Sequence, residues 1–342
     1  TKLMAEQLAS DGHEVIVFGY GKNKIESIEI ENKVKIIRLR EPVFGKNPFV
    51  NFAKTIFERR AYFKSLKKHL EGTTPDIIES YDWSGPLLFK IKGVKLIVRL
   101  HGSHTANNDY MSKKRSVLFS ILEKRAINIA DKLVSVSNHV AEQTKKSFKI
   151  NFSYTTIYNG VDLNKFKDLS IKRDLNKLLV VGRMHDYKGF KELFDSLNFV
   201  FKANNDVHLD IICTIIHDYK ENLMKRVEPK YHQRIPFIGR IDNDFLATKY
   251  NEANLLILPS LTEAFPIIPL ESMACGTPVI MSNRFSSKEI IKDKEDGFLV
   301  NVLDSNALAA GILDAISDQN KIDAMRCKAI NKIATTFGIE EI

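Results

Sequence analysis

Short apolar runs alternate with amphipathic stretches along the first half of the chain. Runs of four to six apolar residues have the length of buried strands, and the stretches between them have the period of helices. Alternation of this kind is typical of a parallel sheet covered by helices on both faces. The predicted strands are 15–18, 34–39, 76–79, 95–100, 132–136 and 155–158, and the predicted helices are 1–10, about 49–70, 115–130 and 138–148.

The second half repeats this alternation, so it is predicted to be a second doubly wound sheet. Between the halves, the dipeptide Asn159-Gly160 is a strong turn signal. We expect a linker at about 160–175 and two α/β domains, 1–165 and 166–342. The predicted strands of the second domain are 177–181, 207–213, 254–258, 278–281 and 297–301, with helices at 190–201, 245–250, near 269–275 and from 306 onward.

Two carboxylates flank the start of one short predicted helix. Glu263 lies in the loop after the strand 254–258, and Glu271 follows eight residues later, in the first turns of a helix that opens near Pro269 and ends at Gly276. Open α/β sheets bind ligands in the crevice at the carboxyl ends of their strands. The backbone N–H groups at a helix start also suit a phosphate. This stretch is therefore the candidate site.

Two cations follow the first strand of the second domain. Gly182 and Arg183 come directly after the strand 177–181, and Lys188 precedes the helix 190–201. The helix dipole favours acids at a helix start, so two cations there indicate a function. Arginine can bind two phosphate oxygens at once, and lysine supplies a compact second charge. We expect this pair to hold a diphosphate.

These stretches resemble a known enzyme family. Glu263-Ala-Phe-Pro, followed by Leu270-Glu-Ser-Met-Ala-Cys-Gly-Thr-Pro, resembles the E-x7-E motif of retaining glycosyltransferases of family 4, which have the GT-B fold. The segment from Gly182 to Gly189 resembles their G-R-x4-K-G signature. The resemblance implies two Rossmann-like domains facing each other across a cleft. The first would bind the acceptor and the second the nucleotide-sugar donor.

The resemblance also implies the reaction. A sugar would move, with retention, from a nucleotide diphosphate donor (a UDP- or GDP-sugar) to a glycan or lipid-linked acceptor in cell-surface polysaccharide biosynthesis. No metal and no other cofactor are expected. No enzyme nucleophile is evident, and the resemblance implies that the leaving phosphate helps to deprotonate the acceptor.

Roles for single residues follow from the same resemblance. Glu263 would hold donor sugar hydroxyls and steady positive charge at the anomeric carbon, and Glu271 would accept hydrogen bonds from the ribose hydroxyls. His101, which follows the strand 95–100, would close over the sugar from the first domain. The other residues expected to bind the donor are Gly182, Arg183, Lys188, Arg240, Ile241, Phe265, Pro266, Ile267 and Ile268, where Pro266 has no N–H to donate.

Family members have a strand and a Gly-rich loop before their first helix, and a last helix that crosses back to the first domain. Neither is found in this sequence, which also has no initiator Met and no secretory signal. We therefore expect the chain to be a fragment.

Charge is spread unevenly. Residues 1–165 hold 28 basic and 17 acidic side chains, whereas residues 166–342 hold 23 and 25. The predicted helix 49–70 is basic and amphipathic, which fits either an ordinary helix with a solvated face or contact with anionic lipid headgroups. The sequence contains no run of eighteen apolar residues, which is about the length that a membrane-spanning helix needs. We expect a cytoplasmic protein, peripheral on the inner face of the membrane.

Other classes remain open. A nucleotide-sugar epimerase shares this fold, and a non-catalytic subunit that binds nucleotide sugars is a further alternative. An NAD oxidoreductase would need a G-x-G-x-x-G loop, which is not visible, and no aromatic platform accompanies the basic residues, so nucleic acid is not an expected partner. Asp242-Asn-Asp244 resembles a metal-binding D-x-D string, but its place before the helix 245–250 indicates an N-cap with acids in the first turn.

Overall fold

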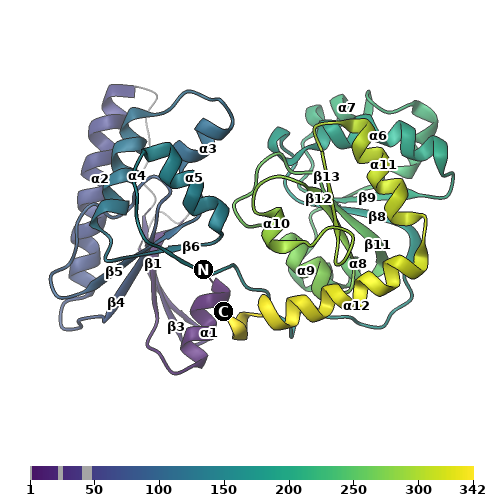
Figure 1. Cartoon of the computed structure of the whole chain (residues 1–342). Coiled ribbons are helices and arrows are strands. Elements are labelled where there is room, and N and C mark those ends of the chain that lie inside the picture. The colour runs from purple at the N-terminus through teal and green to yellow at the C-terminus, as the bar shows by residue number, and fades with distance from the viewer. Residues whose placement is uncertain (1, 22–25, 41–47) are drawn as a thin grey trace. The chain divides into compact units, whose positions relative to one another are not determined.

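A computed structural model describes residues 2–21, 26–40 and 48–342, and the side chains from residue 54 onward in the last range. Thr1, the first residue of the predicted helix 1–10, lies outside the described residues. The chain divides into two compact units, Thr1–Tyr158 and Asn159–Ile342, each with its own sheets and helices (Figure 1).

The first unit contains a parallel sheet of four strands in chain order. Its strands are β4 (Ile77–Tyr81), β5 (Lys95–Leu100), β6 (Lys132–Ser135) and β7 (Thr155–Thr156). Its helices are α2 (Pro48–His69), α3 (His104–Tyr110), α4 (Val117–Ile129) and α5 (Asn138–Phe148). Ser137 caps α5 by accepting a hydrogen bond from the backbone N–H of Val140, as its place before the helix indicates.

This unit also contains a second, separate sheet, which was not predicted from the sequence. This sheet has three strands, β1 (Ile16–Gly21), β2 (Ser27–Glu31) and β3 (Val34–Arg40), and the helix α1 (Lys2–Ser10) packs on β1 and β3. Strand β1 pairs with β3 in parallel, and β2 pairs antiparallel to β3 through a tight turn at Asn32-Lys33, where both φ angles are positive. The sequence predicted one sheet for this half, whereas the described strands β1 and β4 belong to different sheets.

The second unit has one sheet of six parallel strands in the order β10-β9-β8-β11-β12-β13. These strands are β8 (Asp174–Val181), β9 (His208–Ile212), β10 (Phe237–Gly239), β11 (Ala253–Leu258), β12 (Val279–Ser282) and β13 (Phe298–Val300). The helices are α6 (Phe190–Ala203), α7 (His217–Met224), α8 (Asn243–Glu252), α9 (Ile268–Ala274), α10 (Ser287–Ile290), α11 (Ser305–Ile316) and α12 (Gln319–Thr336), and short 3₁₀ turns are η1 (Asp186–Lys188), η2 (Pro229–Arg234) and η3 (Ile339–Glu341).

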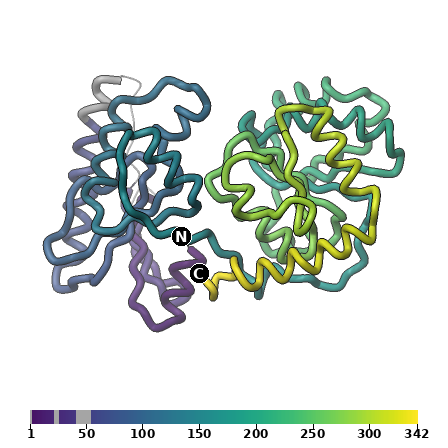
Figure 2. Tube along the Cα trace, viewed as in Figure 1, coloured from purple at the N-terminus to yellow at the C-terminus, as the bar shows by residue number. Residues whose placement is uncertain are grey.

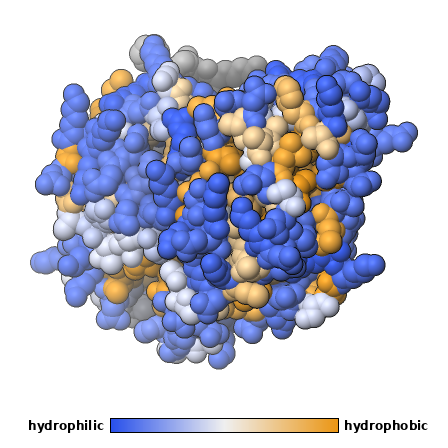
Figure 3. All heavy atoms as spheres, turned by 45° about the vertical axis from the view of Figure 1, so that its right-hand side comes forward, coloured by the Kyte–Doolittle hydropathy of each residue, from blue (hydrophilic) through white to orange (hydrophobic). Residues whose placement is uncertain are grey.

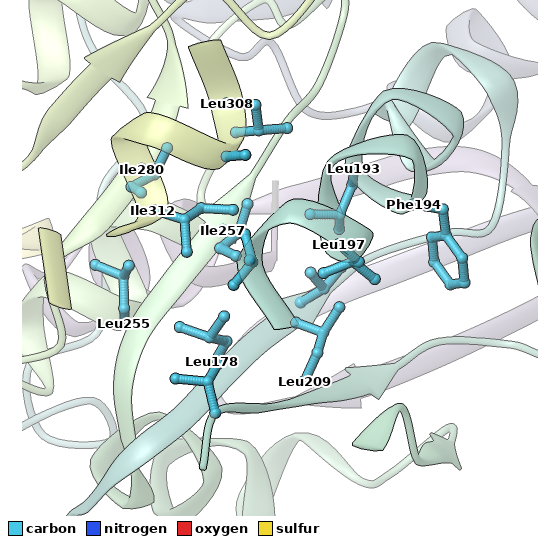
Figure 4. Packing of buried hydrophobic residues seen from close by; sticks show 14 of the residues in the cluster. Leu178, Leu193, Phe194, Leu197, Leu209, Leu255, Ile257, Ile280, Leu308 and Ile312 are labelled. Atoms are coloured by element: carbon cyan, nitrogen blue, oxygen red, sulfur yellow. The ribbon is translucent and has the colours of Figure 1, made fainter. Parts of the chain in front are cut away.

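Helices cover both faces of this sheet. Leu255 and Ile257 of β11 point toward α6 and α11, where they pack with Leu197 and Ile312 (Figure 4). Helices α8, α9 and α12 lie on the opposite face (Figures 1 and 2). Every residue of β11 is buried, the polar Asn254 included, and the apolar run that follows, 255–258, is typical of a strand buried on both faces. Burial of each such side chain contributes about 1.5–3 kcal/mol.

The order of the strands positions the site. From β8 the chain moves outward through β9 and β10, and it then returns to place β11 on the other side of β8. Connections therefore leave β8 and β11 in opposite directions, which opens a crevice at the carboxyl ends of these two strands. The loops that follow β8 and β11 carry the predicted cations and carboxylates.

Candidate active site

The loops after β8 and β11 meet through an ion pair. The ammonium Nζ of Lys188 lies 2.6 Å from Oε1 of Glu263. The exposed fractions of the two side chains are 17% and 15%, so both are largely withdrawn from water. Two residues predicted separately, 75 positions apart in sequence, are thus in direct contact.

The backbones of the two loops are also fastened together. The N–H of Leu261 donates to the carbonyl of Tyr187 at 2.8 Å. Gly189 has a φ of +71°, and a Cβ atom there would lie 1.9 Å from the carbonyl oxygen of Pro259. Only glycine allows this approach. The contact holds the end of the Lys188 loop against the start of the Glu263 loop.

Arg183 lies in the same loop but is not paired. Gly182, at the end of β8, donates its N–H to the carbonyl of Ile212 on β9, which fixes where the loop begins. The Arg183 side chain is exposed, and among the described residues it makes no ion pair or side-chain hydrogen bond. The carboxyl edge of β8 therefore presents one unpaired guanidinium and one ammonium paired with Glu263.

Glu271 has a different partner. It lies in the first turn of α9, and its Oε2 accepts a hydrogen bond of 2.9 Å from the hydroxyl of Tyr250 on α8. Burial raises the pKa of Glu271, which the Tyr250 hydroxyl and the charge of Lys165 oppose. Tyr250 is fully buried. Sequence reasoning missed it, because a tyrosine on the apolar side of a helix has the pattern of an ordinary core residue.

The loop between the two carboxylates is shaped by its apolar side chains. Phe265 is buried with its ring 5.7 Å from that of Phe337, and its carbonyl accepts from the side-chain amide of Asn159 at 2.8 Å. Pro266 is buried, while the side chain of Ile267 is exposed. The helix α9 begins at Ile268, one residue before Pro269.

Two of the predicted residues lie at another part of the sheet. Arg240 and Ile241 follow β10, the edge strand of the sheet. Two strands, β9 and β8, lie between β10 and β11. Arg240 is exposed, and in the described part of the chain no hydrogen bond or ion pair joins either residue to Lys188 or Glu263. Their predicted role near the nucleotide base stays a prediction.

His101 follows β5 in the first unit, and its backbone N–H donates to Oδ1 of Asp82 at 2.9 Å. His101 as a whole residue is exposed, yet burial of its imidazole and the charge of the Arg99 guanidinium lower its pKa to about 4. The imidazole is therefore neutral at pH 7. Asp82 is fully buried, which raises its pKa to about 7.

A second buried carboxylate lies behind His101. Glu123 on α4 is fully buried and accepts hydrogen bonds from the backbone N–H groups of Ser84, His104 and Thr105 and from the Thr105 hydroxyl. It thereby ties the loops after β4 and β5 to α4. Neither carboxylate was among the predicted site residues, and Asp82 lies three residues after the end of the predicted strand 76–79.

The D-x-D string does not form a metal cluster. Asp242 occupies the N-cap position of α8 without a side-chain capping bond, and Asp244 pairs with Lys165 at 2.7 Å. Among the residues that the structure describes, no group of three or more His, Cys, Asp or Glu side chains is arranged to hold a metal ion. None of the described helices has the length and apolar character needed to cross a membrane.

Comparison with protein families matches both halves of the chain. Residues 162–332 match the family described as Glycosyl transferases group 1, and residues 1–165 match Glycosyltransferase Family 4. One relative, the UDP-Gal:alpha-D-GlcNAc-diphosphoundecaprenol alpha-1,3-galactosyltransferase of Escherichia coli, is 25% identical over 297 residues, which cover 80% of this chain and 75% of that protein.

Solved structures agree on the fold. Sucrose-phosphate synthase of Thermosynechococcus elongatus superposes with a TM-score of 0.81 at 22% identity, covering 98% of this chain and 88% of that one. HepE of Anabaena, solved with UDP and glucose, superposes with a TM-score of 0.66 at 18% identity, covering 90% and 84%.

Proposed function

The chain belongs to the group 1 glycosyl transferases and has the GT-B fold, and on this basis we propose that it is a retaining, metal-independent glycosyltransferase. Its donor is a nucleotide diphosphate sugar with UDP or GDP. Its acceptor is a glycan or a lipid-linked glycan of cell-surface polysaccharide biosynthesis.

One observation carries the proposal. Lys188 and Glu263 form an ion pair at the point where the strand order of the second unit reverses, and the unpaired Arg183 follows the same strand. A crevice at such a point suits a nucleotide, and the two cations suit its diphosphate. An epimerase would use the same nucleotide site, so turnover distinguishes the two functions.

Each group has a defined task in this proposal. Arg183 and Lys188 neutralise the negative charge that grows on the leaving diphosphate, which stabilises the transition state. Glu263 holds the donor sugar and faces the positive charge that develops at its anomeric carbon. Glu271 accepts hydrogen bonds from the ribose. His101 is neutral at pH 7, so its ring can accept a hydrogen bond from a sugar hydroxyl or donate one to it. A neutral ring does not compete with Arg183 and Lys188 for the phosphate.

The second half of the proposal concerns the acceptor. The name of the E. coli relative describes a lipid-linked acceptor, which supports an acceptor of that class here. Helix α2 presents an exposed face of Phe57, Arg60, Lys64 and Lys68, at helical spacing. A basic helix face with an apolar residue suits an anionic membrane surface. We place the protein at the cytoplasmic face of such a membrane.

Helix α4 also exposes apolar side chains beside a lysine. Val117 and Ile121 lie one turn apart on its outer face and are 73% and 57% exposed, with Lys124 on the same face. Figure 3 shows a face of the molecule on which hydrophilic side chains predominate and apolar ones lie between them, and this view does not single out α2 or α4. Binding to anionic vesicles that is reversed by high salt supports membrane association, whereas equal binding to neutral vesicles contradicts it.

The activity itself is tested with a donor screen. UDP-, GDP-, ADP- and dTDP-sugars are offered without added metal to the wild type, to Glu263→Ala, and to Glu295→Ala, an exposed glutamate paired with Lys292 far from the site. One donor should be hydrolysed slowly by the wild type and by the control, and about 100-fold more slowly by Glu263→Ala. Isomerisation of the free donor without hydrolysis or transfer would instead identify an epimerase.

A further inference from the structure

The hydroxyl of Tyr250 has no part in the function proposed so far. It is completely buried on α8, where a phenylalanine would pack equally well. A buried hydroxyl needs a hydrogen-bond partner, and this one donates to Oε2 of Glu271 at 2.9 Å. A buried hydroxyl, that of Tyr250, therefore contacts Glu271, the carboxylate that we propose binds the ribose.

The two side chains are held by a common frame. The backbone carbonyl of Tyr250 accepts from Oγ1 of Thr277 at 2.6 Å, just past the end of α9. The N–H of Thr277 donates to the carbonyl of Ser272, and the Ser272 hydroxyl donates to the carbonyl of Thr277. These bonds fasten the end of α8 to α9, which carries Glu271. The Tyr250 hydroxyl is thus fixed with respect to the backbone of Glu271.

The hydrogen bond from Tyr250 occupies one acceptor position of the carboxylate and, among the described residues, leaves Oε1 without a protein partner. A tyrosine hydroxyl can only donate to an ionised carboxylate, so Oε2 is engaged by Tyr250. Within the described part of the chain, Oε1 has no hydrogen-bond partner, and Glu271 is only partly buried. A glutamate has three side-chain torsions, and anchoring one oxygen orients the other before a ligand arrives.

We infer that Tyr250 is a positioning residue that aims the Glu271 carboxylate at the ribose of the donor, and that it thereby sets the preference for ribonucleotides over 2′-deoxyribonucleotides. The inference rests on the proposed function, in which Glu271 accepts hydrogen bonds from the ribose. A vicinal diol offers two O–H donors at fixed separation, so its binding depends on the direction of the accepting oxygen. Loss of the 2′-hydroxyl removes one of these donors.

The test measures that preference by calorimetry. UDP, GDP and ADP are each titrated beside their 2′-deoxy counterparts into the wild type, Tyr250→Phe and Glu271→Ala. Tyr231→Phe is the matched control, because Tyr231 is also a buried tyrosine of this unit but lies in η2. We expect the wild type and Tyr231→Phe to prefer the ribonucleotide, and Tyr250→Phe to reduce that preference about five- to tenfold, the effect of one hydrogen bond.

The outcomes separate the inference from the proposed function. If Glu271→Ala loses the preference while Tyr250→Phe keeps it in full, the role of Tyr250 is overturned and the ribose contact of Glu271 stands. If the wild type has no preference, or Glu271→Ala retains it, the ribose contact fails and the inference fails with it. Circular dichroism of each variant confirms that Tyr250→Phe is folded, since a purely structural tyrosine would alter stability without changing the ratio of the two affinities.

Discussion

Lys188 and Glu263 form an ion pair across the two loops of the site, with Nζ 2.6 Å from Oε1 and both side chains largely buried. The pair aligns the ammonium with the carboxylate in a place where each has lost most of its water. A diphosphate that enters this crevice must therefore share Lys188 with Glu263. Because the charges are pre-positioned, they need little reorganisation when negative charge develops on the leaving group.

Removing the lysine should affect both binding and stability. In Lys188→Met, Glu263 keeps its partly buried charge without a partner, so we expect a loss of about 1–3 kcal/mol in the free energy of unfolding. Affinity for the nucleoside diphosphate should fall about tenfold or more, because a charge-assisted contact is lost. Chemical unfolding and calorimetry measure the two effects.

Lys191→Met is the matched control for this variant. Lys191 belongs to α6, is exposed, and pairs with Asp186 at 3.1 Å. An exposed pair of this kind contributes about 0–1 kcal/mol, so the control should unfold and bind nearly as the wild type does. Equal affinities in Lys188→Met and the control would contradict the diphosphate role of Lys188.

The second unit shows how far apolar pattern and turn residues can specify a fold. The predicted strands 177–181 and 254–258 are the cores of β8 and β11, and the α/β fold class is confirmed. The family resemblance is confirmed as well. These features follow from local rules, because a buried parallel strand needs a continuous apolar run and a helix needs a repeating apolar face.

Features that depend on contacts between distant segments could not be predicted. The turn at Asn32-Lys33 lacks the glycine that usually marks a two-residue hairpin, so β2 went unnoticed. The bond from Tyr250 to Glu271 joins two helices whose patterns give no sign of each other. Burial of Asp82 likewise depends on how the loops around His101 close, which is set by packing and not by local sequence.

The activity should not depend on a bound metal ion. The proposed site supplies positive charge through Arg183 and Lys188, which does the work that a divalent cation does elsewhere. Dialysis against EDTA should leave the transfer rate within about twofold of the untreated enzyme. Steady-state assays with and without added Mg²⁺ or Mn²⁺ check this. A large loss on dialysis that either ion restores would show that a metal is needed.

The pair of Asp82 and His101 should give the first unit an unusual dependence on pH. The pKa of Asp82 is about 7 in the folded state, whereas the usual value of an aspartate is 3.8. At a pH between these two values, the folded state therefore holds a proton that the unfolded chain has released. Its contribution to stability therefore falls as pH rises. The pKa of His101 moves from 6.5 to about 4, so the unfolded chain holds the extra proton, and this contribution rises with pH.

Single substitutions should separate these opposing contributions. In His101→Asn only Asp82 remains, so we expect the unfolding free energy to fall by about 2–3 kcal/mol from pH 4.5 to 6.5. In Asp82→Asn only His101 remains, and stability should rise over the same interval, by less because His101 is exposed as a whole residue and water screens its charge. Fluorescence of Trp83, the single tryptophan, reports unfolding of this unit. A slope of the same sign in both variants would contradict the assignment.

Gly189→Ala tests the close approach of the two loops that carry the proposed diphosphate and sugar contacts. The new methyl group would lie 1.9 Å from the carbonyl oxygen of Pro259, so the loop carrying Glu263 must move. We expect a loss of about 3–4 kcal/mol in stability and a strong loss of activity. Gly239→Ala is the control, because Gly239 also has a positive φ, +88°, but a Cβ added there would have no atom within 4 Å. This variant should therefore lose only about 1–2 kcal/mol, from backbone strain. Thermal unfolding that shifts equally in the two variants would mean that the Pro259 contact contributes nothing beyond the strain.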